Sequence, residues 1–276
     1  MYKLVGFDLD GTLLNDKGIL DDISLNMLRN IKKEEVDILI VTGRSYFSAA
    51  KYFKNFDFNI SIISNNGNLT RSLKDDSLID INPIDIKDVL KIYKLVDGGN
   101  IYPLVHINGF DDGYDIATIV KDTSNHVKRY PHGFGNRALY LKDFNLLDYD
   151  VLSIVFAGEY DDLVYYKKLL DNKISAEFNI HLSYVRSKDL YILEVLQKSG
   201  DKYYGVKRYI ESNDIIFNEI IFVGDDTNDL LLIENAGIGI GMCNGNELVK
   251  RKADFITQYS NNDNGALREV LKILRG

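Results

Sequence analysis

Short apolar runs alternate with helix-period segments at both ends of this chain, and that alternation most constrains how it can fold. Residues 4–7, 38–41 and 60–63 have the length of buried strands, and apolar residues between them recur at helical spacing. The alternation returns late in the chain, where it predicts strands at 220–223 and 238–242. Strands that alternate with helices predict a parallel sheet covered on both faces.

The pattern changes near Pro83. A helical stripe over 86–93 is followed by strand-like segments at 102–107, 151–156 and 180–185, with a helix expected at 163–170. A polar stretch at 132–137 carries no assignment. The simplest organisation is a core built from 1–82 and 189–276, with an α/β domain inserted at 83–188, because insertions are tolerated at loops whose ends lie close together.

Composition excludes several classes of protein. The chain has 33 Lys and Arg against 41 Asp and Glu, a net charge of −8, which argues against binding to nucleic-acid phosphates. The apolar runs fall well short of the ~20 residues that span a bilayer. A single cysteine excludes an intramolecular disulfide and a four-cysteine zinc site, and favours a reducing, cytoplasmic location. We expect no nucleic acid or membrane partner; a monomer fits, although the sequence leaves the oligomeric state open.

Two carboxylates stand at the end of the first expected strand. Asp8 and Asp10 are followed by Gly11, at the sheet edge where open α/β proteins bind ligands. An ordinary polar turn remains an alternative. A calcium loop is excluded, because its sixth and twelfth positions would be Leu13 and Ile19 instead of glycine and glutamate.

Three further signals occur later in the chain, two of them at the ends of apolar strands and the third before the helix expected around Val206. Each has an ordinary explanation when taken alone, as a turn, a surface charge or a helix cap. They are Thr42-Gly43-Arg44, Lys202, and Gly224-Asp225-Asp226-Thr227-Asn228-Asp229. Clustered carboxylates offer the hard oxygen ligands that magnesium prefers.

Taken together, these residues resemble a known family. The four ordered motifs of the haloacid dehalogenase superfamily are matched by Asp8-x-Asp10-Gly-Thr, Thr42-Gly43-Arg44, Lys202 and Gly224-Asp225-x-x-Asn228-Asp229. Asn66-Gly67 and the tail over 236–257 are similar to Cof-type hydrolases with a type IIB cap. The resemblance implies a Rossmann-like parallel-sheet core with an inserted α/β cap of the C2B type, which would select the substrate. The chain departs from the family at Tyr203, Asp226 and Cys243, where glycine is common.

The resemblance also implies a function. The expected protein is a magnesium-dependent phosphatase, a phosphoric monoester hydrolase acting on a small phosphorylated metabolite such as a sugar phosphate or a nucleotide. Asp8 would be the nucleophile that forms an aspartyl-phosphate, and Asp10 would be the acid and base. Magnesium would bind the Asp8 and Asp225 side chains and the Asp10 backbone carbonyl. The phosphoryl oxygens would be held by Thr42, Gly43, Lys202 and Asn228, and Asp229 would orient Lys202 or a water on the metal.

Two other functions remain open at this point. A phosphomutase could use the same scaffold, and a non-catalytic sensor could bind a phosphorylated ligand, although the intact acidic set argues against the sensor. The histidines show no metal-ligand spacing, and we interpret them as structural or surface residues; they are His106, His126, His132 and His181. The run Gly237-x-Gly239-x-Gly241 is not a dinucleotide motif, because it follows a helix instead of opening one.

Overall fold

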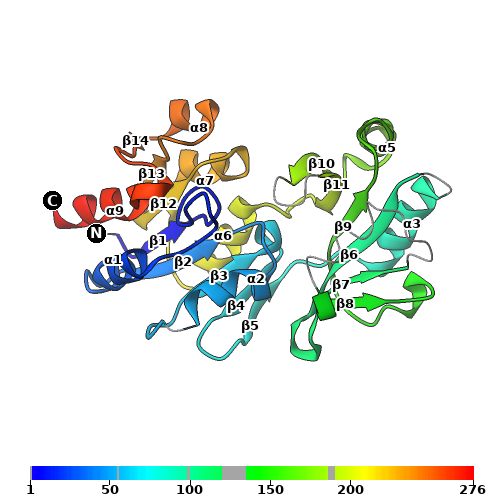
Figure 1. Cartoon of the computed structure of the whole chain (residues 1–276), viewed down its shortest axis with the longest axis horizontal. Coiled ribbons are helices and arrows are strands. Elements are labelled where there is room, and N and C mark those ends of the chain that lie inside the picture. Colours follow the sequence, from blue (N-terminus) through cyan, green and yellow to red (C-terminus); the bar gives the residue numbers. More distant parts are fainter. Residues whose placement is uncertain (1, 55, 98–99, 120–134, 186–189) are drawn as a thin grey trace. The chain divides into compact units, whose positions relative to one another are not determined.

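The chain forms two compact units in a computed structural model that describes residues 2–54, 56–97, 100–119, 135–185 and 190–276 (Figure 1). The first unit contains Met1–Ile81 and Asp201–Gly276, and the second is Asn82–Gly200. His126 and His132 lie outside the described residues, as do residues 132–134 of the unassigned stretch, whose last three residues form a short 3-10 helix at Gly135–Arg137. In the described part of the chain, no helix combines the length and apolar character needed to cross a membrane.

The first unit is built on an eight-stranded sheet with the order β14-β13-β12-β1-β2-β3-β4-β5. The six strands from β14 to β3 run parallel, and β4 and β5 are added antiparallel. The expected parallel sheet is therefore confirmed. The strands are β1 Leu4–Phe7, β2 Asp37–Val41, β3 Ser61–Ser64, β4 Leu69–Ser72, β5 Leu78–Ile81, β12 Ile220–Gly224, β13 Ile238–Gly241 and β14 Phe255–Ile256.

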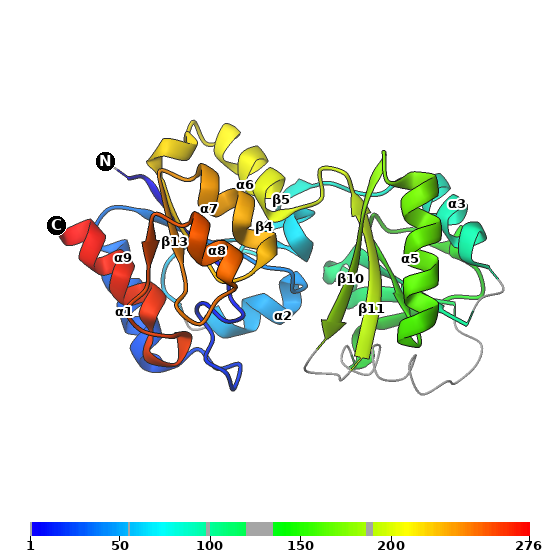
Figure 2. The same cartoon turned by 90° about the horizontal axis from the view of Figure 1, so that it is seen from above.

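Helices cover both faces of this sheet, because alternate strand residues are apolar on each side. On one face Leu4, Leu39 and Phe222 pack with apolar residues of α6 Lys202–Glu211, α7 Leu230–Asn235 and α8 Glu247–Lys252. On the other side of the sheet lie α1 Asp22–Lys32, α2 Tyr46–Ala50 and α9 Gly265–Arg275 (Figure 2). The sheet is therefore a buried layer whose strand ends are its accessible part.

In the part of the second unit that the structure describes, six strands form a mostly antiparallel sheet with the order β10-β11-β9-β6-β7-β8. Among the described residues, α3 Ile86–Val96 and α5 Tyr160–Ile174 pack against this sheet, and their Val89 and Leu163 share one buried cluster with the strand residue Phe156. The strands are β6 Tyr102–Gly109, β7 Tyr114–Thr118, β8 Ala138–Tyr140, β9 Val151–Ala157, β10 Phe178–Val185 and β11 Leu190–Gln197.

The strand β11 places the end of the second unit later than the boundary expected at 188. Leu193 lies opposite Phe156 of β9 and Leu182 of β10, so β11 is an interior strand of the second sheet. Its apolar run resembles those of the first unit, and the run by itself does not specify which sheet it joins. The chain returns to the first unit at Asp201, directly before α6.

Candidate active site

The carboxyl ends of β12, β1 and β2 meet at one edge of the first sheet. Asp225 follows β12, Asp8 follows β1 and Thr42 follows β2. The strand hydrogen bonding continues into these positions, because the Asp8 amide donates to the Val223 carbonyl at 3.0 Å and the Thr42 amide donates to Ile63 at 2.8 Å. The parallel topology thus brings together acidic residues that are more than 200 positions apart in the sequence.

Lys202 is the first residue of α6 and is almost completely buried, with 2% of its surface exposed. Its Nζ donates to Asp8 Oδ1 at 2.6 Å and to Asp229 Oδ1 at 2.7 Å. Burial acts to lower the pKa of Lys202, but the charges of Asp229 and Asp8 outweigh it and raise the pKa above its ordinary value. The ammonium therefore remains protonated between two carboxylates.

Asp229 is fully buried and has both oxygens engaged by the protein. While Oδ1 accepts from Lys202, Oδ2 accepts from the backbone amides of Asp225 at 3.1 Å and Asp226 at 3.3 Å. A Cβ on Gly224 would lie 2.5 Å from the Asp229 carboxyl carbon, so glycine is needed for this close approach. Asp229 therefore fixes the loop that carries Asp225 and holds the ammonium of Lys202.

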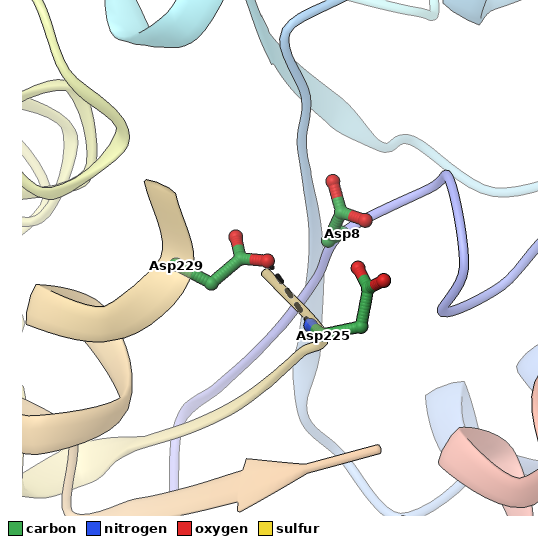
Figure 3. A group of neighbouring side chains, drawn as sticks. All are labelled: Asp8, Asp225 and Asp229. Carbon is green, nitrogen blue, oxygen red and sulfur yellow. Dashed lines mark hydrogen bonds between the residues drawn. The ribbon is translucent and has the colours of Figure 1, made fainter. Parts of the chain in front are cut away.

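Asp8, Asp225 and Asp229 each offer a carboxylate oxygen, and these atoms all lie within 4.8 Å of one another (Figure 3). Burial raises the pKa of Asp8 well above its ordinary value, against the opposing charge of Lys202. Burial and the charge of Asp229 raise the pKa of Asp225 to about 7. Both shifts therefore come mainly from burial, and the charge of the neighbouring Asp229 carboxylate adds to them.

The donor set fits a hard divalent cation. Carboxylate oxygens are the ligands that Mg²⁺ prefers, and a bound cation would lower the raised pKa values. Because both oxygens of Asp229 are already engaged, Asp8 and Asp225 are the side chains that would hold the ion. The Asp10 carboxylate is not part of this cluster, and the expected role of the Asp10 carbonyl stays a prediction.

The loop after β1 is pressed against Asp225. Gly11 has a left-handed φ of +79°, and a Cβ there would lie 2.2 Å from Asp225 Oδ2. The Thr12 hydroxyl donates to Asp225 Oδ1 at 3.4 Å, and the Asn244 amide donates to the Gly11 carbonyl at 2.8 Å. The glycine of the first motif is thus required by a specific neighbour as well as by its backbone conformation.

The Asp10 carboxylate is held by Arg44 instead. The guanidinium donates from Nε to Asp10 Oδ2 at 2.6 Å and from Nη2 to Oδ1 at 2.5 Å. It also donates from Nη1 to the Tyr52 hydroxyl at 2.9 Å, and its hydrogen bonds to Asp10 raise the pKa of Arg44. The sequence places Arg44 in a motif but does not predict its contact with Asp10. The one sequence feature that points to a role in the site is its position two residues after Thr42, at the end of a strand.

The residues expected to bind phosphoryl oxygens lie on the same loops. Thr42 is buried, and its hydroxyl oxygen accepts from the Arg44 amide at 3.1 Å. Asn228 is exposed, and its Nδ2 donates to Asn66 Oδ1 at 3.4 Å. A Cβ on Gly43 would approach the same Asn66 oxygen to 2.9 Å. Their role toward phosphate stays a prediction, and the sequence motifs do not assign Asn66 to this group.

The carboxyl edge of the parallel sheet therefore carries buried carboxylates and a lysine in an arrangement that fits a divalent cation. The profile of haloacid dehalogenase-like hydrolases matches residues 5–270. The chain therefore belongs to this family, and it is a phosphatase of the haloacid dehalogenase superfamily, a phosphoric monoester hydrolase.

Similar proteins match along nearly the whole chain. The 5-amino-6-(5-phospho-D-ribitylamino)uracil phosphatase YitU of Bacillus subtilis is 26% identical over 96% of this chain and 95% of its own length. The pyridoxal phosphate phosphatase YbhA of Escherichia coli is 22% identical over 92% of both chains. A haloacid dehalogenase-like hydrolase from Bacteroides thetaiotaomicron shares the fold, with a TM-score of 0.82 at 23% identity over 99% of this chain and all of its own.

Proposed function

We propose that this protein is a magnesium-dependent phosphatase that hydrolyses small phosphorylated metabolites through an aspartyl-phosphate on Asp8. One observation carries the proposal: Lys202 lies between Asp8 and Asp229 in a buried cluster that also contains Asp225. The names of the relatives YitU and YbhA, whose substrates are phosphate esters, support the substrate class.

Asp8 has the position of a nucleophile. One of its oxygens attacks phosphorus, the bond from phosphorus to the leaving oxygen breaks, and an acyl phosphate forms on the Asp8 carboxyl. The ammonium of Lys202 reduces the repulsion between the Asp8 carboxylate and the incoming phosphate, which at 4 Å is about 4 kcal/mol per pair of unit charges at an effective dielectric of 20.

Asp10 supplies the proton transfers. In the first step its carboxyl group gives a proton to the departing oxygen, so the alcohol leaves neutral. In the second step the Asp10 carboxylate accepts a proton from a water that attacks the acyl phosphate, which releases inorganic phosphate and regenerates Asp8. Arg44 would hold the carboxylate in a fixed orientation for both transfers.

The side chains of Asp8 and Asp225 and the backbone carbonyl of Asp10 would hold Mg²⁺. The ion supplies charge that offsets the excess negative charge of the carboxylates and the phosphate. Thr42, Gly43, Lys202 and Asn228 would hold phosphoryl oxygens through hydroxyl, amide and ammonium donors. These groups recognise the phosphoryl group alone, so we propose that the second unit selects the leaving group.

Phosphate release from a panel of phosphorylated metabolites tests the proposal, measured with Mg²⁺ and with EDTA. Magnesium-dependent release that is lost in Asp8→Asn supports it. A folded protein that binds Mg²⁺ but releases no phosphate from any member of the panel would count against it. Chromatography of the products separates a phosphomutase, because a mutase would return an isomerised ester and little free phosphate.

A further inference from the structure

The turn after β3 has an unusual backbone. Asn65, Asn66 and Gly67 have successive left-handed φ values of 49°, 52° and 95°. Asparagine tolerates this conformation better than most residues, but only glycine adopts it without strain. Strained backbone is retained where the surrounding structure over-determines it, and such positions cluster at functional sites.

Hydrogen bonds clamp this turn to the loop after β2. The backbone N–H of Asn66 donates to the Thr42 carbonyl at 3.1 Å, and the backbone N–H of Asn65 donates to the Arg44 carbonyl at 2.9 Å. The turn also packs against the start of α6, where a Cβ on Gly67 would lie 2.0 Å from the Asp201 carbonyl oxygen. The turn therefore contacts two of the segments that form the candidate active site.

The side chain of Asn66 extends this contact to a third segment. Its Oδ1 accepts from Asn228 Nδ2 at 3.4 Å and lies 2.9 Å from where a Cβ on Gly43 would be. One amide oxygen thus lies against two of the residues proposed to hold the phosphoryl group. The Nδ2 group of Asn228 has two N–H donors, so giving one to Asn66 leaves the other to meet a phosphoryl oxygen.

We propose that Asn66 is a positioning residue for phosphate binding. The left-handed turn places the side-chain amide of Asn66 where it orients Asn228 and sets the path of the loop at Gly43. The inference rests on the proposed function, because it assigns Asn228 and Gly43 to the phosphoryl group. Asn66 acts through those two residues, and no contact between Asn66 and substrate is required.

The variant Asn66→Gly tests this inference, because glycine can keep the left-handed backbone while the side-chain amide is removed. The readout is competitive inhibition by inorganic phosphate of the hydrolysis of p-nitrophenyl phosphate in Mg²⁺. We expect the inhibition constant to rise about fivefold, the loss expected of one hydrogen bond, with the melting temperature unchanged or raised. Asp214→Gly is the matched control, since Asp214 is exposed, has a φ of 53° and lies outside the site.

A double-mutant cycle distinguishes positioning from a general structural role. Because Asn66 acts in part through Asn228, Asn66→Gly should have a clearly smaller effect on phosphate inhibition in an Asn228→Ala background, and the effect that remains measures its action on the loop at Gly43. Equal effects in both backgrounds, or an unchanged inhibition constant in the single variant, would overturn the inference. Failure of the wild-type protein to hydrolyse any phosphate ester would instead count against the proposed function.

Discussion

The ammonium of Lys202 lies 2.6 Å from the carboxylate of Asp8, and both side chains are buried. This pair joins the first residue of α6 to the end of β1, across 194 positions of the sequence. A buried ion pair contributes little to stability when complete, but loss of one partner leaves a buried charge uncompensated. The pair therefore links the stability of the fold to the charge balance of the site.

Replacing Lys202 should destabilise the metal-free protein. In Lys202→Met the length of the side chain is roughly kept, but Asp8 and Asp229 lose their common cation. We expect the free energy of unfolding in EDTA to fall by about 3–5 kcal/mol, with hydrolysis abolished, and saturating Mg²⁺ to recover part of the stability. Urea unfolding with and without Mg²⁺ measures this. An unfolding free energy equal to that of the wild type in EDTA would show that the ammonium does not balance these carboxylates.

The raised pKa of Asp225 predicts how stability depends on pH without metal. The folded protein holds this proton up to about pH 7, whereas the unfolded chain releases it near the ordinary value of 3.8. The folded state therefore binds more protons in this range, so its stability should fall as the pH rises from about 4 to about 7. Asp8, whose pKa is also raised, acts in the same direction.

Urea unfolding in EDTA at about pH 5 and about pH 7 measures that dependence. The wild type should lose more stability between the two pH values than Asp225→Asn, which has no carboxylate to ionise at this position. Saturating Mg²⁺ should reduce the wild-type loss, since metal binding favours the ionised form. Identical pH dependence in the two proteins in EDTA would contradict the raised pKa of Asp225.

Two glycines with similar left-handed backbone angles allow the cost of backbone strain to be measured apart from the cost of a steric contact with Asp225. Gly11 has a φ of +79° and faces Asp225. Gly18 has a φ of +69°, and among the described residues only its own atoms and those of its two chain neighbours can come within 4 Å of where its Cβ would lie. Gly18→Ala should cost only the left-handed strain, about 1–2 kcal/mol, and leave activity intact. Gly11→Ala should carry the same strain and also displace Asp225, so that Mg²⁺ binds more weakly. Titration calorimetry with Mg²⁺ compares them, and equal affinities would refute a specific role for Gly11.

Arg44 should affect the chemical step more than substrate binding. Arg44→Lys keeps a positive charge but loses the two-point contact with Asp10, so the carboxylate is less well oriented. We expect kcat to fall about 10- to 100-fold with little change in KM. Arg29→Ala removes an ion pair with Asp57 on the surface and should leave kcat unchanged. A KM effect in Arg44→Lys without a kcat effect would assign the residue to binding instead.

The sequence predicts the parallel sheet and the acidic strand ends well, because both follow from local patterns. Residues 4–7 and 220–223 are apolar runs that end in aspartate-bearing loops, and parallel strands place such ends at one edge. The local pattern carries no information on which distant run pairs with which. The placement of β11 in the second sheet and the antiparallel addition of β4 and β5 therefore emerge only from the structure.

The contacts within the site are less accessible to sequence reasoning. The resemblance to a family identifies Asp8, Asp10 and Asp225. The two hydrogen bonds from Arg44 to the Asp10 carboxylate, in contrast, depend on how two loops face each other in space. The left-handed turn at Asn66 likewise depends on a backbone bond to Thr42, which lies 24 residues earlier. Side-chain geometry of this kind is set by packing across the sheet edge and not by the spacing of residues along the chain.

Trapping the acyl phosphate is the most direct test of the central claim that phosphoryl transfer passes through Asp8. The protein is mixed with a hydrolysed substrate and Mg²⁺, quenched in acid within milliseconds and digested, and the peptide that contains Asp8 is examined by mass spectrometry. We predict a phosphoryl group on Asp8 that is absent in EDTA and in Asp8→Asn. Release of phosphate at the wild-type rate by Asp8→Asn, or a phosphoryl group on a different residue, would contradict it.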